Sequence, residues 1–300
     1  MKTFWTSSAS GFAAGLCVVF IWSFWLIVSR IGATSSLTIF DLAAIRYGVS
    51  ALVSIPFVLY FKPWKDLKKS QIVILTFILG PIYILFVFAG FIFAPAAHGG
   101  IFMNGVLPIF TLSIGIACLG QKPISRKIIG ALIILGATFL LGTDGEHLDL
   151  SQSWKGDVCF LIGAAFFAVY VTLSRLWGIR TIDILLCGAL LNGLIYLPIW
   201  ALFLPSGLGQ AEPFTLTVPI IYQGLVPNLL GLILIAHASK TVGTDATSAL
   251  VASVPALGAV LGVWLLEEHL SVMGWFAVTA LTLGLFMITL SPRQASSPQA

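Results

Sequence analysis

Charged side chains are scarce in this chain. Asp, Glu, Lys and Arg make up 9% of its 300 residues, against roughly 25% in soluble globular domains. Hydrophobic residues account for 59%. Such a chain has too few solvated groups to cover its surface, which excludes a soluble globular domain and predicts an integral membrane protein.

Cysteines and recognisable catalytic motifs are also few. The four cysteines, at positions 17, 118, 159 and 187, are scattered through apolar segments and have neither metal-ligand spacing nor a disulfide framework. The sequence contains no nucleophile elbow, no HExxH zinc motif and no phosphate-binding loop. We therefore predict no enzyme activity, no metal and no cofactor, and keep a membrane enzyme or lipid-modifying protein as a minor alternative.

Acidic residues are missing from the middle of the apolar segments. Those near a segment lie at its ends, at Asp41, Asp157, Asp183, Asp245, Glu267 and Glu268. Buried carboxylates carry protons or sodium ions in many transporters, so their absence leaves the coupling mechanism open and mildly favours facilitated movement or a less direct coupling scheme. We interpret the pair Glu267-Glu268 as a solvated helix end.

Long apolar runs dominate the rest of the chain. A run of about 17 to 25 residues can cross a bilayer as a helix, and these runs do not alternate as barrel strands do. We count ten, at 12–30, 39–61, 71–93, 98–119, 125–142, 157–175, 183–204, 215–237, 245–266 and 271–290. The predicted fold class is an all-α integral membrane protein with ten transmembrane helices.

The sequence repeats itself once. Residues 22–30 (WSFWLIVSR) return at 167–175 (FAVYVTLSR), and residues 106–108 (VLP) have a counterpart at 253–255 (SVP). Each half holds five runs, and because five is odd the second half must cross the membrane in the opposite sense. We predict two inverted five-helix repeats, residues 1–147 and 148–300, within one membrane domain.

Basic residues predict the orientation of the chain. Lys and Arg accumulate in cytoplasmic loops. With the N-terminus inside, twelve of the fifteen Lys and Arg residues fall on the cytoplasmic side. We predict a protein of the cell inner membrane with both termini cytoplasmic, so the net charge of +4 needs no nucleic-acid partner.

Aromatic side chains recur at helical spacing in the first and sixth runs. Trp22, Trp25 and Ser29 are spaced i, i+3, i+7 and share one helix face. The same spacing recurs in the second half, at Phe167, Tyr170 and Ser174. These faces predict an aromatic-lined central cavity that stacks on planar, apolar or cationic substrates, with bundle packing or interfacial aromatics as the alternative.

Prolines interrupt corresponding runs in the two halves. Pro108 and Pro255 lie in mid-run, where a proline bends the helix and frees a carbonyl. Asn104 precedes Pro108 by about one turn and can reach the same region. Matching breaks in two halves indicate a transport site, although kinks that only shape the bundle remain an alternative.

Further breaks and polar groups add to this list. Pro81 and Pro227 each follow a glycine closely, with Tyr83 and Asn228 just beyond them. His98 begins the fourth run and could bind a polar group, although a histidine at a run end is more often structural. Arg46, near the start of the second run, can snorkel to the surface or bind a substrate carboxylate.

Short motifs in this pattern resemble those of a known transporter family. Residues 41–47 (DLAAIRY) and 268–271 (EHLS) are similar to motifs of the drug/metabolite transporter (DMT) superfamily, EamA type. Asn104-x-x-x-Pro108, followed by Gly120-Gln121-Lys122, resembles the YddG branch, which exports aromatic amino acids. The resemblance implies alternating access around a central cavity formed largely by spans 1, 3, 4, 6, 8 and 9.

These observations predict an inner-membrane exporter of amino acids, aromatic or other apolar ones, and possibly related metabolites. Its partners are the small-molecule substrate and the lipid bilayer. The predicted substrate-binding residues are Trp22, Trp25, Tyr83, His98, Asn104, Tyr170 and Asn228, with Pro108 and Pro255 as helix-bending residues. Alternatives are an exporter of planar cationic drugs and a metabolite importer.

Overall fold

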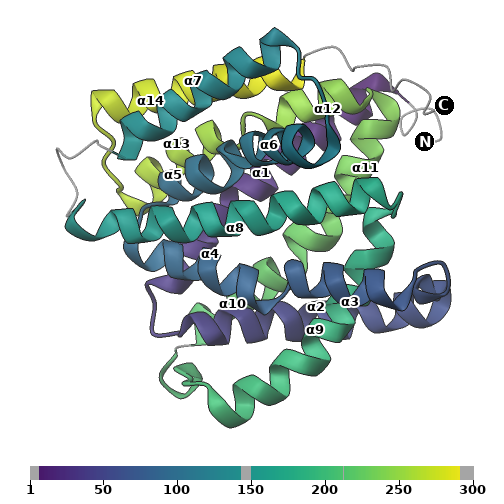
Figure 1. The fold of residues 1–300 in the computed structure, drawn as a ribbon. Coiled ribbons are helices and arrows are strands. Elements are labelled where there is room, and N and C mark those ends of the chain that lie inside the picture. The colour runs from purple at the N-terminus through teal and green to yellow at the C-terminus, as the bar shows by residue number, and fades with distance from the viewer. Residues whose placement is uncertain (1–6, 143–149, 212, 291–300) are drawn as a thin grey trace.

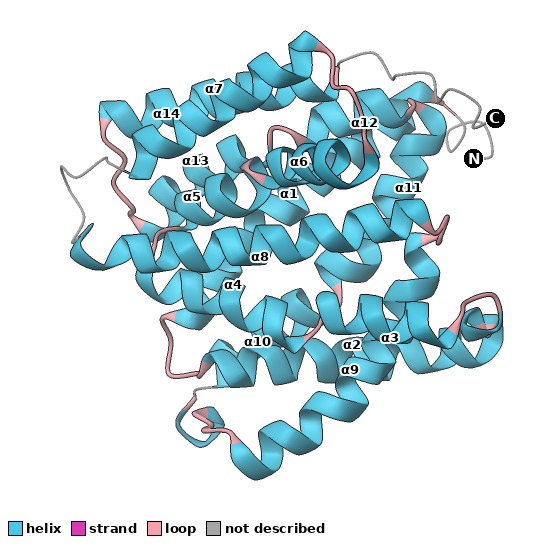
Figure 2. Ribbon diagram, in the orientation of Figure 1, coloured by secondary structure: helices cyan, strands magenta, loops and turns pink. Residues whose placement is uncertain are grey.

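A computed structural model describes residues 7–142, 150–211 and 213–290. The described part of the chain is built from helices and loops, without a strand (Figure 2). The helices of the first half are α1 (Ser8–Ala33), α2 (Ile39–Phe61), α3 (Lys69–Ile78), α4 (Pro81–Phe93), α5 (Ala96–His98), α6 (Leu107–Leu119) and α7 (Ser125–Gly142). Those of the second half are α8 (Leu150–Leu176), α9 (Thr181–Phe203), α10 (Pro213–Gly224), α11 (Gly231–Thr241), α12 (Thr244–Val251), α13 (Val254–Leu266) and α14 (Val272–Thr289).

Nine helical segments within these described ranges are long and apolar enough to cross a membrane. Three of them join two helices each, α3 with α4, α5 with α6, and α12 with α13. The remaining predicted run, 215–237, falls on α10 and α11, which a π-helical segment at Val226–Leu230 separates. The all-α membrane fold is confirmed, whereas the count of ten spans stays a prediction.

The helix breaks lie beside prolines. Pro81 stands in the first turn of α4, Pro108 in that of α6 and Pro255 in that of α13. A proline has no N–H to donate and fits the first turn of a helix, where that donor has no partner anyway. Each proline therefore starts a new helix after the previous one ends. Before α6, the chain forms a second π-helical segment at Gly99–Gly105, a feature often found at functional sites.

The last two helices of each half correspond closely. α13 and α14 have the lengths of α6 and α7 and follow them by 147 residues at both ends. The connecting loops also agree, because Gly120 (φ 61°) and Glu267 (φ 54°) both end their helix in the left-handed conformation. These two pairs of helices and their loops are therefore built alike, while the division into two repeats stays a prediction.

Helices of the two halves interleave in the bundle. The long helices run across the view in Figure 1, with α7 and α14 together along the top and α2 beside α9 below. Between these layers, α1 packs on α11 and α13, and α4 packs on α8. Elements of both halves therefore form the centre of the bundle.

Glycines allow the closest helix approaches. A Cβ added at Gly156 of α8 would lie 2.7 Å from the Gly90 carbonyl oxygen of α4, and one at Gly90 would lie 2.5 Å from the Phe160 ring. Between α7 and α14 the contact is reciprocal, since a Cβ at either Gly130 or Gly284 would lie 2.9 Å from the other's carbonyl oxygen. Small residues allow such contacts in membranes, where water does not drive helices together.

Candidate functional site

One cavity lies among α2, α3, α8 and α9, with Leu232 of α11 at its wall. The empty space among these residues measures about 720 Å³, a volume that includes space open to solvent. Leucine and isoleucine side chains form much of its surface. Its polar lining residues are Arg46, Tyr47, Ser50, Ser54, Thr76, Tyr170 and Asn192.

Two hydroxyls at this cavity have no protein partner. Ser50 donates to the Gly224 carbonyl oxygen at 2.9 Å, and Ser54 donates to that of Ala51 at 2.9 Å. The hydroxyls of Thr76 and Tyr170, by contrast, are buried and make no hydrogen bond within the described residues. Because an unpaired buried hydroxyl costs free energy, these two groups favour a bound polar ligand or water.

Aromatic rings stack beside the cavity. The Phe167 ring lies between those of Tyr83 and Tyr170, with centroids 6.1 and 6.0 Å away and interplanar angles of 21° and 13°. We call Tyr83, Phe167 and Tyr170 the ring stack. It brings two of the predicted binding residues together, and Tyr170 lines the cavity itself.

The predicted tryptophans lie on a different surface, where α1 meets the second half. Trp25 Nε1 donates to Gln223 Oε1 at 2.7 Å, and Gln223 Nε2 donates to Ser29 Oγ at 2.9 Å. Trp22 is half-buried and its Nε1 lies 3.5 Å from the Pro227 carbonyl oxygen. Trp25 and Ser29 do share a helix face, but neither tryptophan lines the cavity described above.

The polar candidates are spread along the molecule. Asn104 is half-buried in the π-helical segment Gly99–Gly105, away from the cavity lining. Asn228 lies in the π-helical segment between α10 and α11, and its side chain falls outside the described residues. His98 is buried at the end of α5, where its Nδ1 lies 2.7 Å from Asp157 Oδ1 and its ring stacks on Phe102.

An ion pair lies close to His98. Arg30 Nε is 3.7 Å from Glu268 Oε1, and the Ala96 backbone N–H donates to the Glu268 carboxylate at 2.9 Å. The interpretation of Glu268 as a solvated helix end is therefore wrong, because its side chain is only 9% exposed. We call Arg30, His98, Asp157 and Glu268 the ionic cluster. It ties α1, α5, α8 and the α13–α14 loop together.

Burial also acts on the Glu268 carboxyl electrostatically. Loss of solvation raises its pKa above the ordinary 4.5, against the opposing effects of the Ala96 N–H and of Arg30. The corresponding residue of the first half is Gln121. A Cβ added at Gly115 would lie 2.6 Å from Gln121 Oε1, and a Cβ added at Gly262 would lie 2.6 Å from Glu268 Oε2. The two loops are thus built alike but differ in charge.

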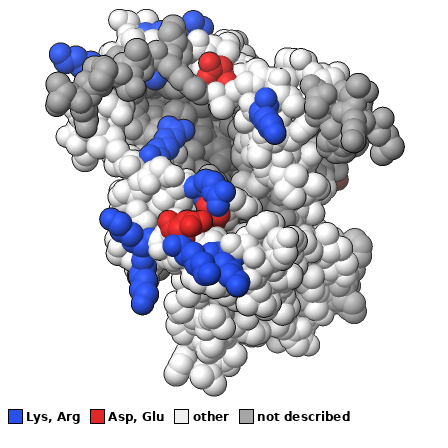
Figure 3. All heavy atoms as spheres, turned by 90° about the vertical axis from the view of Figure 1, so that its right-hand side faces the viewer, with Lys and Arg blue, Asp and Glu red and all other residues white. Residues whose placement is uncertain are grey.

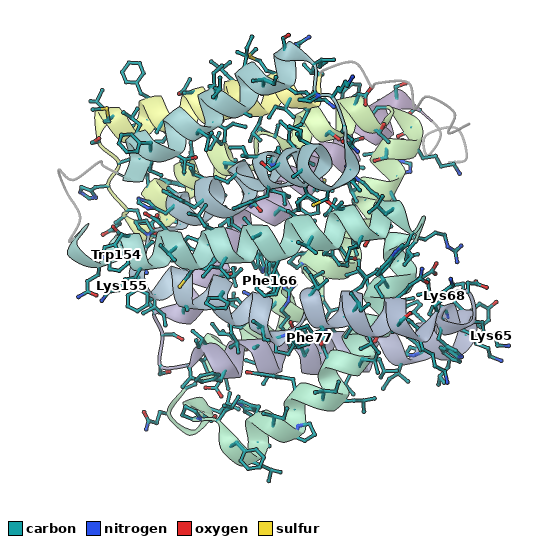
Figure 4. The ribbon with its side chains drawn as sticks, viewed as in Figure 1. Lys65, Lys68, Phe77, Trp154, Lys155 and Phe166 are labelled. Carbon is teal, nitrogen blue, oxygen red and sulfur yellow. The ribbon has the colours of Figure 1, made fainter. Side chains whose placement is uncertain are left out.

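Basic side chains gather at one end of the bundle (Figure 3). Lys65 and Lys68 lie at one end, and Trp154 and Lys155 lie at the other (Figure 4). The end that carries Lys65 faces the viewer in Figure 3, where Lys and Arg side chains gather with fewer acidic ones. This surface follows the charge distribution on which the predicted orientation rests.

Thr76 and Asn192 were absent from the residues predicted from the sequence. Asn192 Nδ2 lies 3.5 Å from the Thr76 carbonyl oxygen, and both residues line the cavity. Each is a polar residue within a long apolar run. An amide within a membrane span is uncommon enough to mark a functional position, and this signal identifies Asn192 without the structure.

Comparisons with known proteins agree with this architecture. A model of the EamA-like transporter family matches the chain twice, at residues 9–143 and 154–290. A Bacillus subtilis (strain 168) protein named "Uncharacterized transporter YwfM" is 24% identical over 212 residues, which cover 68% of each chain. A crystal structure with 19% identity covers 95% of this chain and 99% of its own, with a TM-score of 0.59, and shows likeness of fold alone.

Proposed function

Since the chain belongs to the EamA-like transporter family, we propose that it exports amino acids, aromatic or other apolar ones, across the cell inner membrane. Export proceeds by alternating access in a molecule of two inverted halves with ten spans. The YddG-like motifs around Asn104 and Gln121 support this choice of substrate. The single observation that carries it is the cavity beside the ring stack.

The cavity offers both kinds of contact that an apolar amino acid needs. Arg46 supplies a positive charge, and the unpaired hydroxyls of Thr76 and Tyr170 supply hydrogen-bonding groups. Leu75, Leu79 and the aromatic rings supply apolar surface. A mostly apolar pocket with a few convergent polar groups is the usual form of a small-molecule site.

The helix breaks supply the means of movement. α3–α4, α5–α6, α10–α11 and α12–α13 are each interrupted near a proline, a glycine or a π-helical segment. Broken helices at corresponding places in two halves are typical of transporters that rock around a central site. In this proposal Pro108 and Pro255 set two of the bending points, and the ionic cluster holds one end of the bundle together.

An exporter of planar cationic drugs is the main rival. The ring stack favours it, because cations bind aromatic faces. The charge of the cavity opposes it, since Arg46 is the one charged side chain among the described lining residues. A cation would enter beside a like charge, and no carboxylate is among the described lining residues.

Efflux from proteoliposomes tests the proposal. The protein is reconstituted in liposomes loaded with labelled amino acids, and efflux is compared across a panel with and without a pH gradient. We expect efflux of phenylalanine, tryptophan or leucine above that of aspartate and lysine. Transport of a cationic dye without efflux of any amino acid would overturn the proposal.

A further inference from the structure

One basic side chain stands among the described lining residues of the cavity. Arg46 lines it, whereas no Asp or Glu is among its described lining residues. Two acidic residues near the lining residues in the sequence accept hydrogen bonds from other groups. Asp183 accepts hydrogen bonds from Arg180 at 2.6 and 3.0 Å, and Asp41 accepts them from Trp200 and from the Gly207 backbone at 3.0 and 2.8 Å.

The hydroxyls of Thr76 and Tyr170 point to the kind of group that binds near Arg46. Both residues are more than nine-tenths buried, and neither hydroxyl makes a hydrogen bond of ordinary geometry within the described residues, while the equally buried Ser174 hydroxyl lies near that of Tyr170. Gly188 of α9 lies beside one of them, since a Cβ at that position would make an ordinary van der Waals contact with Thr76 Oγ1 at 3.5 Å. A hydroxyl and a guanidinium both donate to carboxylate oxygens, and Arg does so with a planar set of five donors.

We propose that the cavity recognises the carboxylate of its substrate, through Arg46 with Thr76 and Tyr170, and does not require an ammonium group. The substrate class is then apolar and aromatic monocarboxylates, of which amino acids are one subset. The inference rests on the proposed function in taking this cavity as the transport site. It goes beyond that function in stating which end of the substrate the protein selects.

Three ligands that share one phenylethyl body separate the charged groups. L-phenylalanine carries both a carboxylate and an ammonium, 3-phenylpropanoate only the carboxylate, and 2-phenylethylamine only the ammonium. Isothermal titration of the purified full-length protein in detergent compares their Kd values. We expect similar Kd values for the first two ligands. The amine should have a Kd at least about 10-fold higher, which corresponds to about 1.4 kcal/mol of binding free energy, because it has no carboxylate for Arg46 to bind.

The outcomes of this titration distinguish failure of the carboxylate site from failure of amino-acid export. If 3-phenylpropanoate binds and L-phenylalanine does not, the carboxylate site stands while amino-acid export fails. If the amine binds as tightly as 3-phenylpropanoate, or if none of the three binds, the inference is overturned. Amino-acid efflux from liposomes then decides the proposed function independently.

Substitutions assign the recognition to named groups. Arg46→Gln should raise the Kd of 3-phenylpropanoate by about 10-fold or more and leave that of 2-phenylethylamine unchanged or lower, a change of preference that a folding defect does not produce. Arg175→Gln, at an exposed position outside the cavity, is the matched control. An unchanged preference in Arg46→Gln would overturn the assignment.

Two further variants remove only hydroxyls and keep the test decisive if Arg46→Gln does not fold. Thr76→Val and Tyr170→Phe should each raise the Kd of 3-phenylpropanoate severalfold, since each deletes one hydrogen bond to a charged group. Thr282→Val is their control, because its hydroxyl bonds to the Val278 carbonyl oxygen in α14, away from the cavity. Wild-type Kd values in both cavity variants would refute the role of the hydroxyls.

Discussion

The Glu268 carboxylate is almost entirely buried. The carboxylate accepts from the Ala96 backbone and lies near Arg30 and His98, yet lost solvation still raises its pKa. A carboxyl with a raised pKa binds more protons in the folded state than in the unfolded state, so stability falls as the pH rises. The Glu268 carboxyl thus makes the ionic cluster sensitive to pH.

Glu268→Gln should remove this sensitivity. In the wild type, we expect the midpoint of thermal unfolding to fall as the pH rises above 4.5, the ordinary pKa of the carboxyl, and we expect a flatter profile in the variant. The substitution gives the second half the glutamine that the first half has at Gln121. Glu267→Gln is the control, since that side chain is exposed. Equal slopes in the wild type and Glu268→Gln would contradict the prediction.

At the level of residues, the sequence predicts which side chains belong to a candidate site better than it predicts which side chains contact each other. Tyr83 and Tyr170 were predicted as binding residues from their spacing and their spans, and they do lie in one ring stack. The pairing of Trp25 with Gln223, 198 positions apart, has no local signal in the sequence. The same holds for Arg30 with Glu268. Which residues line the cavity depends on such long-range packing.

Among the helices, α4 and α8 depend on glycine for their contact. Gly156→Ala would place a Cβ 2.5 Å from that of Ala94 and 2.7 Å from the Gly90 carbonyl oxygen. We expect a loss of about 1–3 kcal/mol of stability, the usual cost of overpacking a well-packed core. Thermal unfolding in detergent measures the loss.

The control for Gly156→Ala is Gly136→Ala in α7. A Cβ at Gly136 has nothing within 4 Å, and alanine is the better helix former by about 1 kcal/mol. This variant should be as stable as the wild type or slightly more stable. Equal stability of the two variants would show that α4 and α8 do not need the close approach.

The sequence predicts the elements well where one physical signal dominates. Long apolar runs predicted the helices, and Pro81, Pro108 and Pro255 predicted where the chain breaks. The π-helical segments at 99–105 and 226–230 were not predicted, because their extra residue per turn depends on packing around the break. Burial of Glu268 was missed for a similar reason, since a charged pair after an apolar run ordinarily faces solvent.

For the whole molecule, the basic side chains at the end shown in Figure 3 lead to a test of orientation. With the four native cysteines replaced by serine, Lys155→Cys and Lys65→Cys place single thiols at opposite ends (Figure 4). We expect a membrane-impermeant thiol reagent added to intact cells to label Lys155→Cys and to label Lys65→Cys only after permeabilisation, because basic loops stay in the cytoplasm. The reverse pattern would invert the proposed orientation and with it the direction of export.

The reciprocal contact of Gly130 and Gly284 has a consequence for how the protein can be assembled. Each half contributes one helix to a joint in which both partners play the same part, as in a symmetric dimer. α1 and α8 add further joints between the halves by packing on helices of the other half. If the two repeats were translated as separate chains, each chain would still contain its own contact surface for every one of these joints. Each of these joints is therefore made by non-covalent packing and does not involve the covalent link between the halves.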